Sequence, residues 1–160
     1  MTDNHAPGAM TFALKLLGLR SHSKDELKRK LLKKGYSAEG IEPVIEKLSR
    51  MGALDDHAFG MEVIRSRSRR KPSGRLKIIA ELRKKGVAET IISELLREYD
   101  SVALCHRAAE KKLGSLREMS EADRKRKLEV FLSNRGFEWQ EIQSALRLLV
   151  LPGADDDEPC

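Results

Sequence analysis

The sequence predicts an all-α protein that consists of three tandem three-helix repeats in an elongated, curved array. The first observation is a glycine that recurs about 50 residues apart, at Gly35, Gly86 and Gly136, as in a repeat protein. The second is that apolar residues stand four and eight positions before each glycine, on one stripe of a helix. The third is an aromatic content of only 4%, which argues against a β-sandwich.

Each recurring glycine is expected to end the middle helix of its repeat. Helices commonly end with a glycine in the left-handed conformation, and the residue after it then packs against the third residue from the helix end. Both positions are apolar in all three repeats, at Leu31 and Tyr36, Leu82 and Val87, and Leu132 and Phe137. We interpret the glycines as structural, because the basic–glycine pairs lack the earlier glycine that a phosphate-binding loop requires.

Nine helices follow from this periodicity, three in each repeat. The middle helix of the first repeat begins at the capping box Ser23-x-x-Glu26, and that of the third begins at Ser120-x-x-Asp123. The middle helix of the second opens at Gly74, directly after a Pro-Ser pair that breaks the preceding helix. The first and third helices of the repeats are expected at Met10–Leu19, Glu39–Met51, Asp55–Arg70, Glu89–Tyr99, Asp100–Leu113 and Glu138–Val150.

One residue conflicts with these helices. Pro43 lies past the first turn of a helix that starts at Ala38, and proline at such a position removes a backbone hydrogen bond. The alternative is a start nearer Ile41, and the sequence leaves both starts open.

The repeats divide the chain into five segments. We place repeat 1 at residues 10–52, repeat 2 at 53–99 and repeat 3 at 100–151, with disordered tails at 1–9 and 152–160. A unit of about 50 residues buries little surface alone, so neighbouring repeats are expected to share interfaces. The second tail is acidic from Asp155 to Glu158, and is interpreted as a solubilising end or as a segment that shields a basic surface or mimics nucleic acid.

Charge and composition limit the classes of function. The chain has 31 Lys and Arg against 25 Asp and Glu, a net charge of +6, which favours a polyanionic partner or an acidic protein surface. No apolar run is long enough to span a bilayer, and the first residues lack the pattern of a signal peptide. Cys105 and Cys160 form no disulfide framework, so we expect a reducing, cytoplasmic location. Nothing in the sequence argues for more than a monomer.

Residues typical of catalysis or metal binding are sparse. The histidines share no spacing with cysteines or acidic residues that would make a metal site. Cys105 and His106 are adjacent and point about 100° apart on a helix, so they are interpreted as a core thiol and a surface imidazole. The residues therefore give little support for catalysis, and we expect no metal site.

Residues 65–85 form the strongest candidate for a binding site. Ten of them are basic and only Glu81 opposes them. Because no large aliphatic or aromatic residue stands between Arg65 and Arg75, this helix end is expected to project into water. A solvated face that complements a helix dipole is the alternative, but so dense a run favours contact with phosphates or acidic side chains. The candidate contact residues are Arg65, Arg67, Arg69, Arg70, Lys71, Arg75, Lys77, Lys84 and Lys85.

Other basic and aromatic residues are interpreted as structural. The group from Lys24 to Lys34 is assigned to a solvated helix face, and Lys111 and Lys112 are too few to interpret. Trp139, the single tryptophan, stands near a helix start and is expected in the core or at a repeat interface rather than in base stacking.

Several short motifs follow one another in a fixed order over most of residues 12–96. They are Ala13-Leu14-x-x-Leu17, Arg20-Ser21-His22-Ser23-x-x-Glu26-Leu27, Leu31-x-x-Lys34-Gly35-Tyr36, Leu54-Asp55-Asp56-x-x-Phe59 and Gly74-x-x-x-Ile78-x-x-Glu81-Leu82-x-x-Lys85-Gly86. The last third follows the repeat, with Gly136-Phe137 at the glycine–aromatic junction. In this order and spacing the chain resembles the RecX family, regulators of the bacterial recombinase RecA.

The resemblance implies a function as well as a fold. It implies three three-helix modules in a curved, elongated body, and a regulatory protein that is not an enzyme and carries no cofactor. Such a protein binds in the groove of the RecA–DNA filament and inhibits recombination, ATP hydrolysis and coprotease activity in DNA repair and the SOS response. It acts by blocking filament growth or by promoting disassembly. The family has no short active-site motif, so the candidate contact residues rest on charge alone, and direct DNA contact is expected to be weak and non-specific.

Two other classes of function stay open. Three-helix units also occur in helix-turn-helix proteins, and a free-standing DNA-binding protein of that kind would prefer its own site by a factor of about 10³ or more. A passive helical-repeat scaffold for an unrelated partner is the other class.

Overall fold

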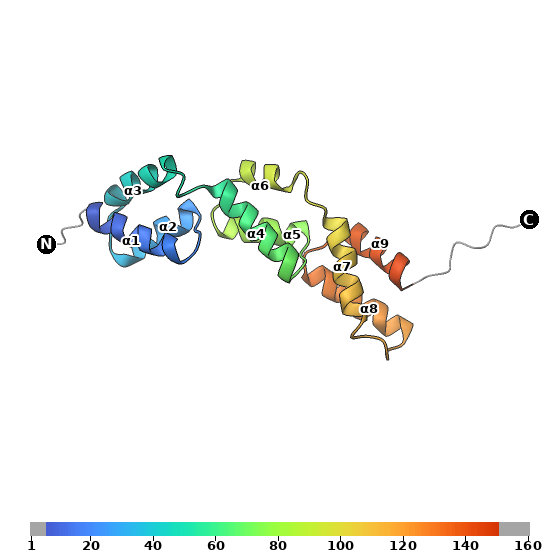
Figure 1. Cartoon of the computed structure of the whole chain (residues 1–160). Helices are drawn as coiled ribbons and strands as arrows, with labels where there is room; N and C mark the ends of the chain where they lie inside the picture. The colour runs from blue at the N-terminus through green and yellow to red at the C-terminus, as the bar shows by residue number, and fades with distance from the viewer. Residues whose placement is uncertain (1–5, 151–160) are drawn as a thin grey trace, which may run out of the picture. The chain divides into compact units, whose positions relative to one another are not determined.

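The computed structural model describes residues 6–150, and all regular structure in this range is helical (Figure 1). This confirms the all-α prediction. No helix within the described range is long and apolar enough to cross a membrane. The helices are α1 (Ala6–Leu19), α2 (Lys24–Lys34), α3 (Ala38–Arg50), α4 (Asp56–Arg70), α5 (Arg75–Lys84), α6 (Glu89–Leu96), α7 (Ser101–Leu113), α8 (Glu121–Asn134) and α9 (Trp139–Leu149).

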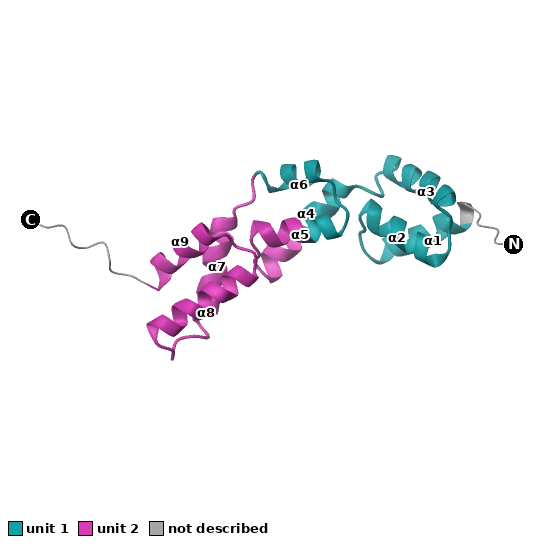
Figure 2. Cartoon of the chain, turned by 180° about the vertical axis from the view of Figure 1, so that it is seen from behind, with its two compact units in different colours: residues 1–63, 81–97 teal, residues 64–80, 98–160 magenta. Residues whose placement is uncertain are grey.

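The chain divides into two compact units that do not follow the repeat boundaries. Unit 1 comprises residues 1–63 and 81–97, and unit 2 comprises residues 64–80 and 98–160 (Figure 2). Helices α4 and α5 each contribute residues to both units. Unit 1 therefore holds the whole of the first repeat and unit 2 the whole of the third, while the middle repeat is shared.

The apolar positions of the repeat are the centre of the fold. The residues four and eight positions before the glycines are all fully buried, namely Leu27, Leu31, Ile78, Leu82, Leu128 and Leu132. In unit 1, α1, α2 and α3 pack around a core that contains the first pair together with Ile41, Val44 and Leu48. In unit 2, α7, α8 and α9 pack around an equivalent core that contains Cys105 and Phe137.

The recurring glycines end their helices as predicted. Gly35, Gly86 and Gly136 have φ angles of 108°, 75° and 80°, in the left-handed region. The amide of the following residue donates to the carbonyl of the third residue from the helix end, at 3.2 Å from Tyr36 and 3.0 Å from Val87. Phe137 repeats this bond at 3.3 Å. These bonds are those of the Schellman motif, which confirms the predicted helix ends.

The predicted helix starts are confirmed at the serine caps and corrected elsewhere. Ser23 accepts from the amide of Glu26, and Ser120 accepts from the amide of Asp123. Helix α1 begins at Ala6, inside the segment 1–9 that we expected to be a tail. The acidic tail at 152–160 lies outside the described residues.

Helix α3 starts at Ala38, so the alternative start nearer Ile41 is wrong. Ser37 caps this helix by accepting from the amide of Gly40 at 3.1 Å, and Pro43 lies inside the helix on its exposed side. The proline removes one helical hydrogen bond. Burial of Val44 and Leu48 on the opposite side, together with the serine cap, outweighs this loss.

In unit 1 the start of α2 contacts the turn between α5 and α6. The hydroxyl of Ser23 donates to the carbonyl of Lys85, and the Lys85 ammonium lies 2.8 Å from a carboxylate oxygen of Glu26. A Cβ atom on Gly86 would collide with Asp25. Gly86 is therefore required for two reasons, namely this close approach and its left-handed backbone conformation.

In unit 2 the start of α5 contacts the turn between α8 and α9 in the same way. The amide of Gly74 donates to the carbonyl of Arg135 at 2.8 Å, and the Arg135 guanidinium donates to the carbonyl of Pro72 at 3.2 Å. A Cβ atom on Gly136 would collide with Lys77. The basic residue before the second and the third of these glycines, Lys85 and Arg135, therefore joins one repeat to another, which confirms that the repeats share interfaces.

Candidate functional site

The candidate contact residues are divided between the two units. Arg65 through Lys77 belong to unit 2, and Lys84 and Lys85 belong to unit 1. Each group of candidate residues is therefore described within its own unit.

In unit 1, Lys85 is held by contacts inside the protein. Its ammonium pairs with Glu26 and lies 5.7 Å from the centroid of the Phe59 ring. Burial raises the pKa of Glu26, but hydrogen bonds from Lys85 and Arg20 outweigh it and hold the pKa below its ordinary value. Lys84 is exposed, and its ammonium has no carboxylate partner within residues 6–150. Lys84 is therefore the better contact candidate of the two.

In unit 2, two of the candidate residues join segments of the unit. Arg75 donates to the carbonyl of Tyr99 at 2.7 Å, and its guanidinium lies 6.0 Å from the centroid of that ring. Lys77 donates to the carbonyl of Asn134 at 3.3 Å. Tyr99 in turn is buried and donates its hydroxyl to the carbonyl of Ser73. Arg75 thus holds the start of α5 against the end of its own repeat, whereas Lys77 contributes to the contact between the second and third repeats.

The end of α4 presents the exposed part of the candidate site. Arg67 is half-buried and makes contacts within the protein. The carbonyl of Ser68 is also used internally, because it accepts a hydrogen bond from Arg107. Four exposed cations here have no carboxylate partner within the described part of the chain, and these are Arg65, Arg69, Arg70 and Lys71. These exposed cations at the end of α4 are therefore free of internal carboxylate pairing, as a contact surface for phosphates or acidic side chains requires.

A cavity beside this helix end was not expected from the sequence. It has a volume of about 210 Å³ and is lined by Arg70 together with Lys111, Lys112 and Arg135. The sequence showed only a lysine pair at one place and the basic residue before a glycine at another, and these signals are too short to indicate a site. The fold brings them together.

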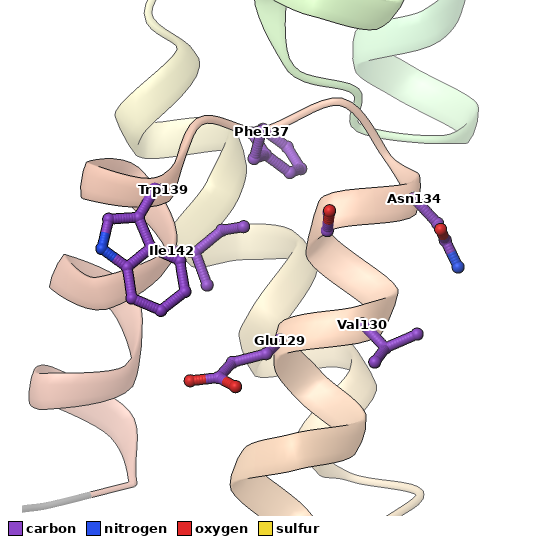
Figure 3. Close-up of a pocket in the computed structure, with 7 residues that line it drawn as sticks. Glu129, Val130, Asn134, Phe137, Trp139 and Ile142 are labelled. Carbon is purple, nitrogen blue, oxygen red and sulfur yellow. The ribbon is translucent and has the colours of Figure 1, made fainter.

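Trp139 corrects the prediction that the tryptophan lies in the core or at a repeat interface. Its side chain is 66% exposed and stands at the start of α9, over a groove between α8 and α9 (Figure 3). The groove has a volume of about 300 Å³ and is also lined by Val130, Phe137 and Ile142. The prediction failed because Ile142, three residues later, fills the core position of this helix instead.

The thiol and imidazole pair does not form a catalytic dyad. Cys105 is buried, and burial, with a smaller contribution from Glu141, raises the pKa of its thiol to about 12. Its neighbour His106 is half-buried and contacts the hydroxyl of Ser144 at 3.4 Å through Nε2. Cys105 is therefore a core residue, as expected, and it is poorly ionised at neutral pH. Within the described residues no group of three His, Cys, Asp or Glu side chains could hold a metal ion.

Comparison with known proteins identifies the family. Three family models match in order along the chain, and they describe the first, second and third three-helix domains of RecX, over residues 9–48, 55–96 and 98–146. A relative from Pelodictyon phaeoclathratiforme (strain DSM 5477 / BU-1), named Regulatory protein RecX, is 98% identical over the full length of both chains. The chain belongs to the RecX family.

Other RecX relatives agree with this assignment. Regulatory protein RecX of Chlorobium limicola is 47% identical, and the alignment covers 97% of this chain and 98% of the relative. The resemblance drawn from the glycine register and the short motifs is thereby confirmed. The relatives are named as regulatory proteins, and this chain is a member of that family of regulators.

Solved RecX structures have the same fold. The crystal structure of RecX from Lactobacillus salivarius matches with a TM-score of 0.80 at 22% identity, and the match covers 93% of this chain and 98% of that one. A second, the crystal structure of regulatory protein RecX, matches with a TM-score of 0.78 at 24% identity and covers 88% of this chain and 72% of that one. The prediction of three three-helix repeats is confirmed.

Proposed function

We propose that this RecX protein binds the RecA–DNA filament and inhibits the recombinase, ATPase and coprotease activities of RecA, and so modulates recombination and DNA repair. Membership of the RecX family is the observation that carries the proposal. In this proposal the protein acts as a cytoplasmic monomer, and it is a regulator rather than an enzyme.

The exposed end of α4 supports the proposal on physical grounds. Arg65, Arg69, Arg70 and Lys71 lack carboxylate partners among the described residues, so binding a partner does not require them to break ion pairs. Both components of the filament offer anionic groups, as phosphates or as acidic side chains. Of the candidate residues, these four and Lys84 are therefore the proposed contacts. Lys77 and Lys85 act mainly by joining repeats, and Arg75 acts mainly within the second repeat.

Repetition supplies a mechanism. Several weak contacts made by one chain act together, because the first contact raises the effective concentration of the next. If the bound filament differs in geometry from the active one, binding shifts the filament toward the inactive state by the difference in the two affinities. Contact with several RecA subunits at once also requires the elongated array expected from the sequence, which stays a prediction.

Co-sedimentation with RecA filaments tests the proposal. We expect the purified protein to pellet with RecA assembled on single-stranded DNA, to pellet far less with the DNA alone at physiological salt, and to inhibit strand exchange. Tight binding to one double-stranded sequence, with no effect on RecA, would instead indicate a free-standing helix-turn-helix protein. If the protein neither binds the filament nor prefers one DNA sequence, the passive helical-repeat scaffold is the remaining class of function.

A further inference from the structure

The cationic cavity of unit 2 is built from three separate segments of chain. Arg70 comes from the end of α4, Lys111 and Lys112 come from the end of α7, and Arg135 follows α8. No acidic residue is among the described residues that line the cavity, and none of the four cations forms an ion pair with another described residue. The cavity therefore concentrates positive charge without internal compensation.

Phe131 orients two of these cations. The Cζ atom of Arg135 lies 4.8 Å from the centroid of the Phe131 ring, and Nζ of Lys112 lies 5.3 Å from it, both within cation–π range. The ring itself packs against the core of the third repeat. Arg135 is further held by its hydrogen bond to the carbonyl of Pro72. Because the core fixes the ring and the ring orients the cations, part of the ordering needed to bind an anion is already present.

Stabilisation of helix ends accounts for only part of this arrangement. Lys111 and Lys112 lie in the last turn of α7, and Arg70 lies in the last turn of α4, where cations complement the helix dipole. That role requires neither a concave site nor Arg135. It also does not require cations from different segments to share one aromatic ring.

The lining matches phosphate chemistry. Guanidinium groups offer paired donors that fit phosphate oxygens, and lysine ammonium groups add point charges. A cavity of about 210 Å³ exceeds the roughly 30 Å³ share of one water several times over, so it has room for a group larger than a small ion. Several backbone phosphates in a row can pair with all four uncompensated cations, whereas a single carboxylate can pair with only one or two of them.

We infer that this cavity is a phosphate-binding site that takes backbone phosphates of single-stranded nucleic acid. A flexible single strand can turn its backbone into a concave, basic surface, and phosphate contacts of this kind carry no base specificity. The inference goes beyond the proposed function and beyond the weak DNA contact that the family resemblance implies, because it assigns a defined site in unit 2 that would bind phosphates without RecA.

Salt-dependent binding of DNA tests the site. The full chain is titrated into a short fluorescein-labelled oligothymidine without RecA, and fluorescence anisotropy gives the affinity at several salt concentrations. For single strands, log K falls with log[salt] by about 0.7 for each phosphate contact. In the triple variant R70Q/K111Q/K112Q we expect weaker binding and a slope that is less steep by about 2.

A charge-matched control keeps the test specific. The variant R117Q/K127Q/R147Q removes three exposed cations of unit 2 that do not line the cavity, and it should keep most of the wild-type slope. Circular dichroism should show the wild-type helical signal for both variants. Equal losses in the two variants, or an unchanged slope in the cavity variant, would overturn the inference.

A second probe separates phosphate from carboxylate. Polyglutamate should compete poorly for the labelled oligothymidine, whereas inorganic pyrophosphate should compete and lose its effect in the cavity variant. If polyglutamate competes as well as an unlabelled oligothymidine of equal charge, the cavity binds an acidic protein segment instead. That result would contradict the inference. Because RecA is absent throughout, failure of this test leaves the proposed inhibition of RecA untouched.

Discussion

At the scale of single residues, Gly86 and Gly35 show two different reasons for a glycine, namely a left-handed helix end and a close contact between repeats. Both have positive φ angles, but a Cβ atom at Gly86 would collide with Asp25, whereas a Cβ atom at Gly35 would meet nothing within 4 Å. Gly35 therefore serves only the helix end. Gly86 serves the helix end and also the contact between repeats.

Substitution of these glycines tests the distinction. G35A should cost about 1–2 kcal/mol of unfolding free energy, since alanine resists the left-handed conformation. G86A should cost clearly more, because the collision adds to the same strain, and G86V more again. Thermal unfolding measures the difference, at about 2–4 °C for each kcal/mol in a chain of this size. Equal melting temperatures for G35A and G86A would show that the contact between α2 and the following repeat is absent.

His22 is a buried residue whose protonation state follows from its neighbours. Nε2 lies 2.8 Å from the ammonium of Lys30, which can only donate, so Nε2 accepts and the proton stands on Nδ1, which donates to the carbonyl of Arg20. Burial is the largest influence and lowers the pKa of His22; the charges of Arg20 and Lys30 act in the same direction, against the Arg20 carbonyl and Glu26. His22 is therefore neutral in the folded protein at neutral pH.

This burial predicts a loss of stability in mild acid. The unfolded chain takes up a proton at His22 near its ordinary pKa of 6.5, while the folded chain does so only at lower pH. Between these two values the unfolded state binds more protons, so the free energy of unfolding falls as the pH drops below 6.5. Urea unfolding at about pH 7.5 and about pH 5.5 should show this fall in the wild type and a smaller one in H22Q.

The exposed His57 provides the control for that experiment. H57Q makes the same substitution at a solvent-exposed histidine, which lies 4.0 Å from Glu94 in a surface pair, and so controls for the loss of one imidazole. A pH dependence that is the same in H22Q and the wild type would show that His22 is not buried in its neutral form.

At the scale of helices, the end of α4 is the proposed contact surface. The variant R65A/R69A/R70A removes three exposed cations and leaves Arg67, which makes contacts inside the protein, in place. With roughly 0.2–1 kcal/mol for each exposed contact, half-inhibition of RecA should require about tenfold more protein. The helical circular dichroism signal should not change, because these side chains are not buried.

Three exposed cations of the first repeat give the matched control. K15A/K47A/R50A removes the same charge from α1 and α3, and should inhibit RecA as the wild type does. Equal loss of inhibition in both triple variants would show that net charge, and not the end of α4, determines binding.

Much of this helical architecture was predictable because its signals are local. A buried stripe such as Leu27 and Leu31, a serine cap such as Ser23 and a left-handed glycine each depend on a few neighbouring residues. Pro43 was harder to place, because the packing that tolerates it lies on the opposite face of its helix.

The candidate site was less predictable because its signals are not local. The density of charge in residues 65–85 identified the exposed end of α4, but not the internal partners of Arg75 and Lys85, which come from distant parts of the sequence. The cationic cavity was missed for the same reason, since its four cations come from three segments that only the fold brings together.

At the scale of the whole molecule, one junction is used twice. The start of a middle helix contacts the basic–glycine turn of the next repeat, at Lys85-Gly86 in unit 1 and at Arg135-Gly136 in unit 2. Because the same residue types recur at the same register, the basic–glycine turn that ends a middle helix also provides the contact with the neighbouring repeat. This is how a chain with little apolar surface in each repeat forms continuous units.

ATP hydrolysis by RecA on single-stranded DNA is the most direct test of the proposed regulation. Preassembled filaments would be titrated with the purified full-length protein, and the hydrolysis rate would be followed over time. The proposed function predicts a progressive loss of hydrolysis at fewer than one regulator per RecA subunit, because one bound molecule affects several neighbours. An unchanged rate with the regulator in excess over RecA would contradict it.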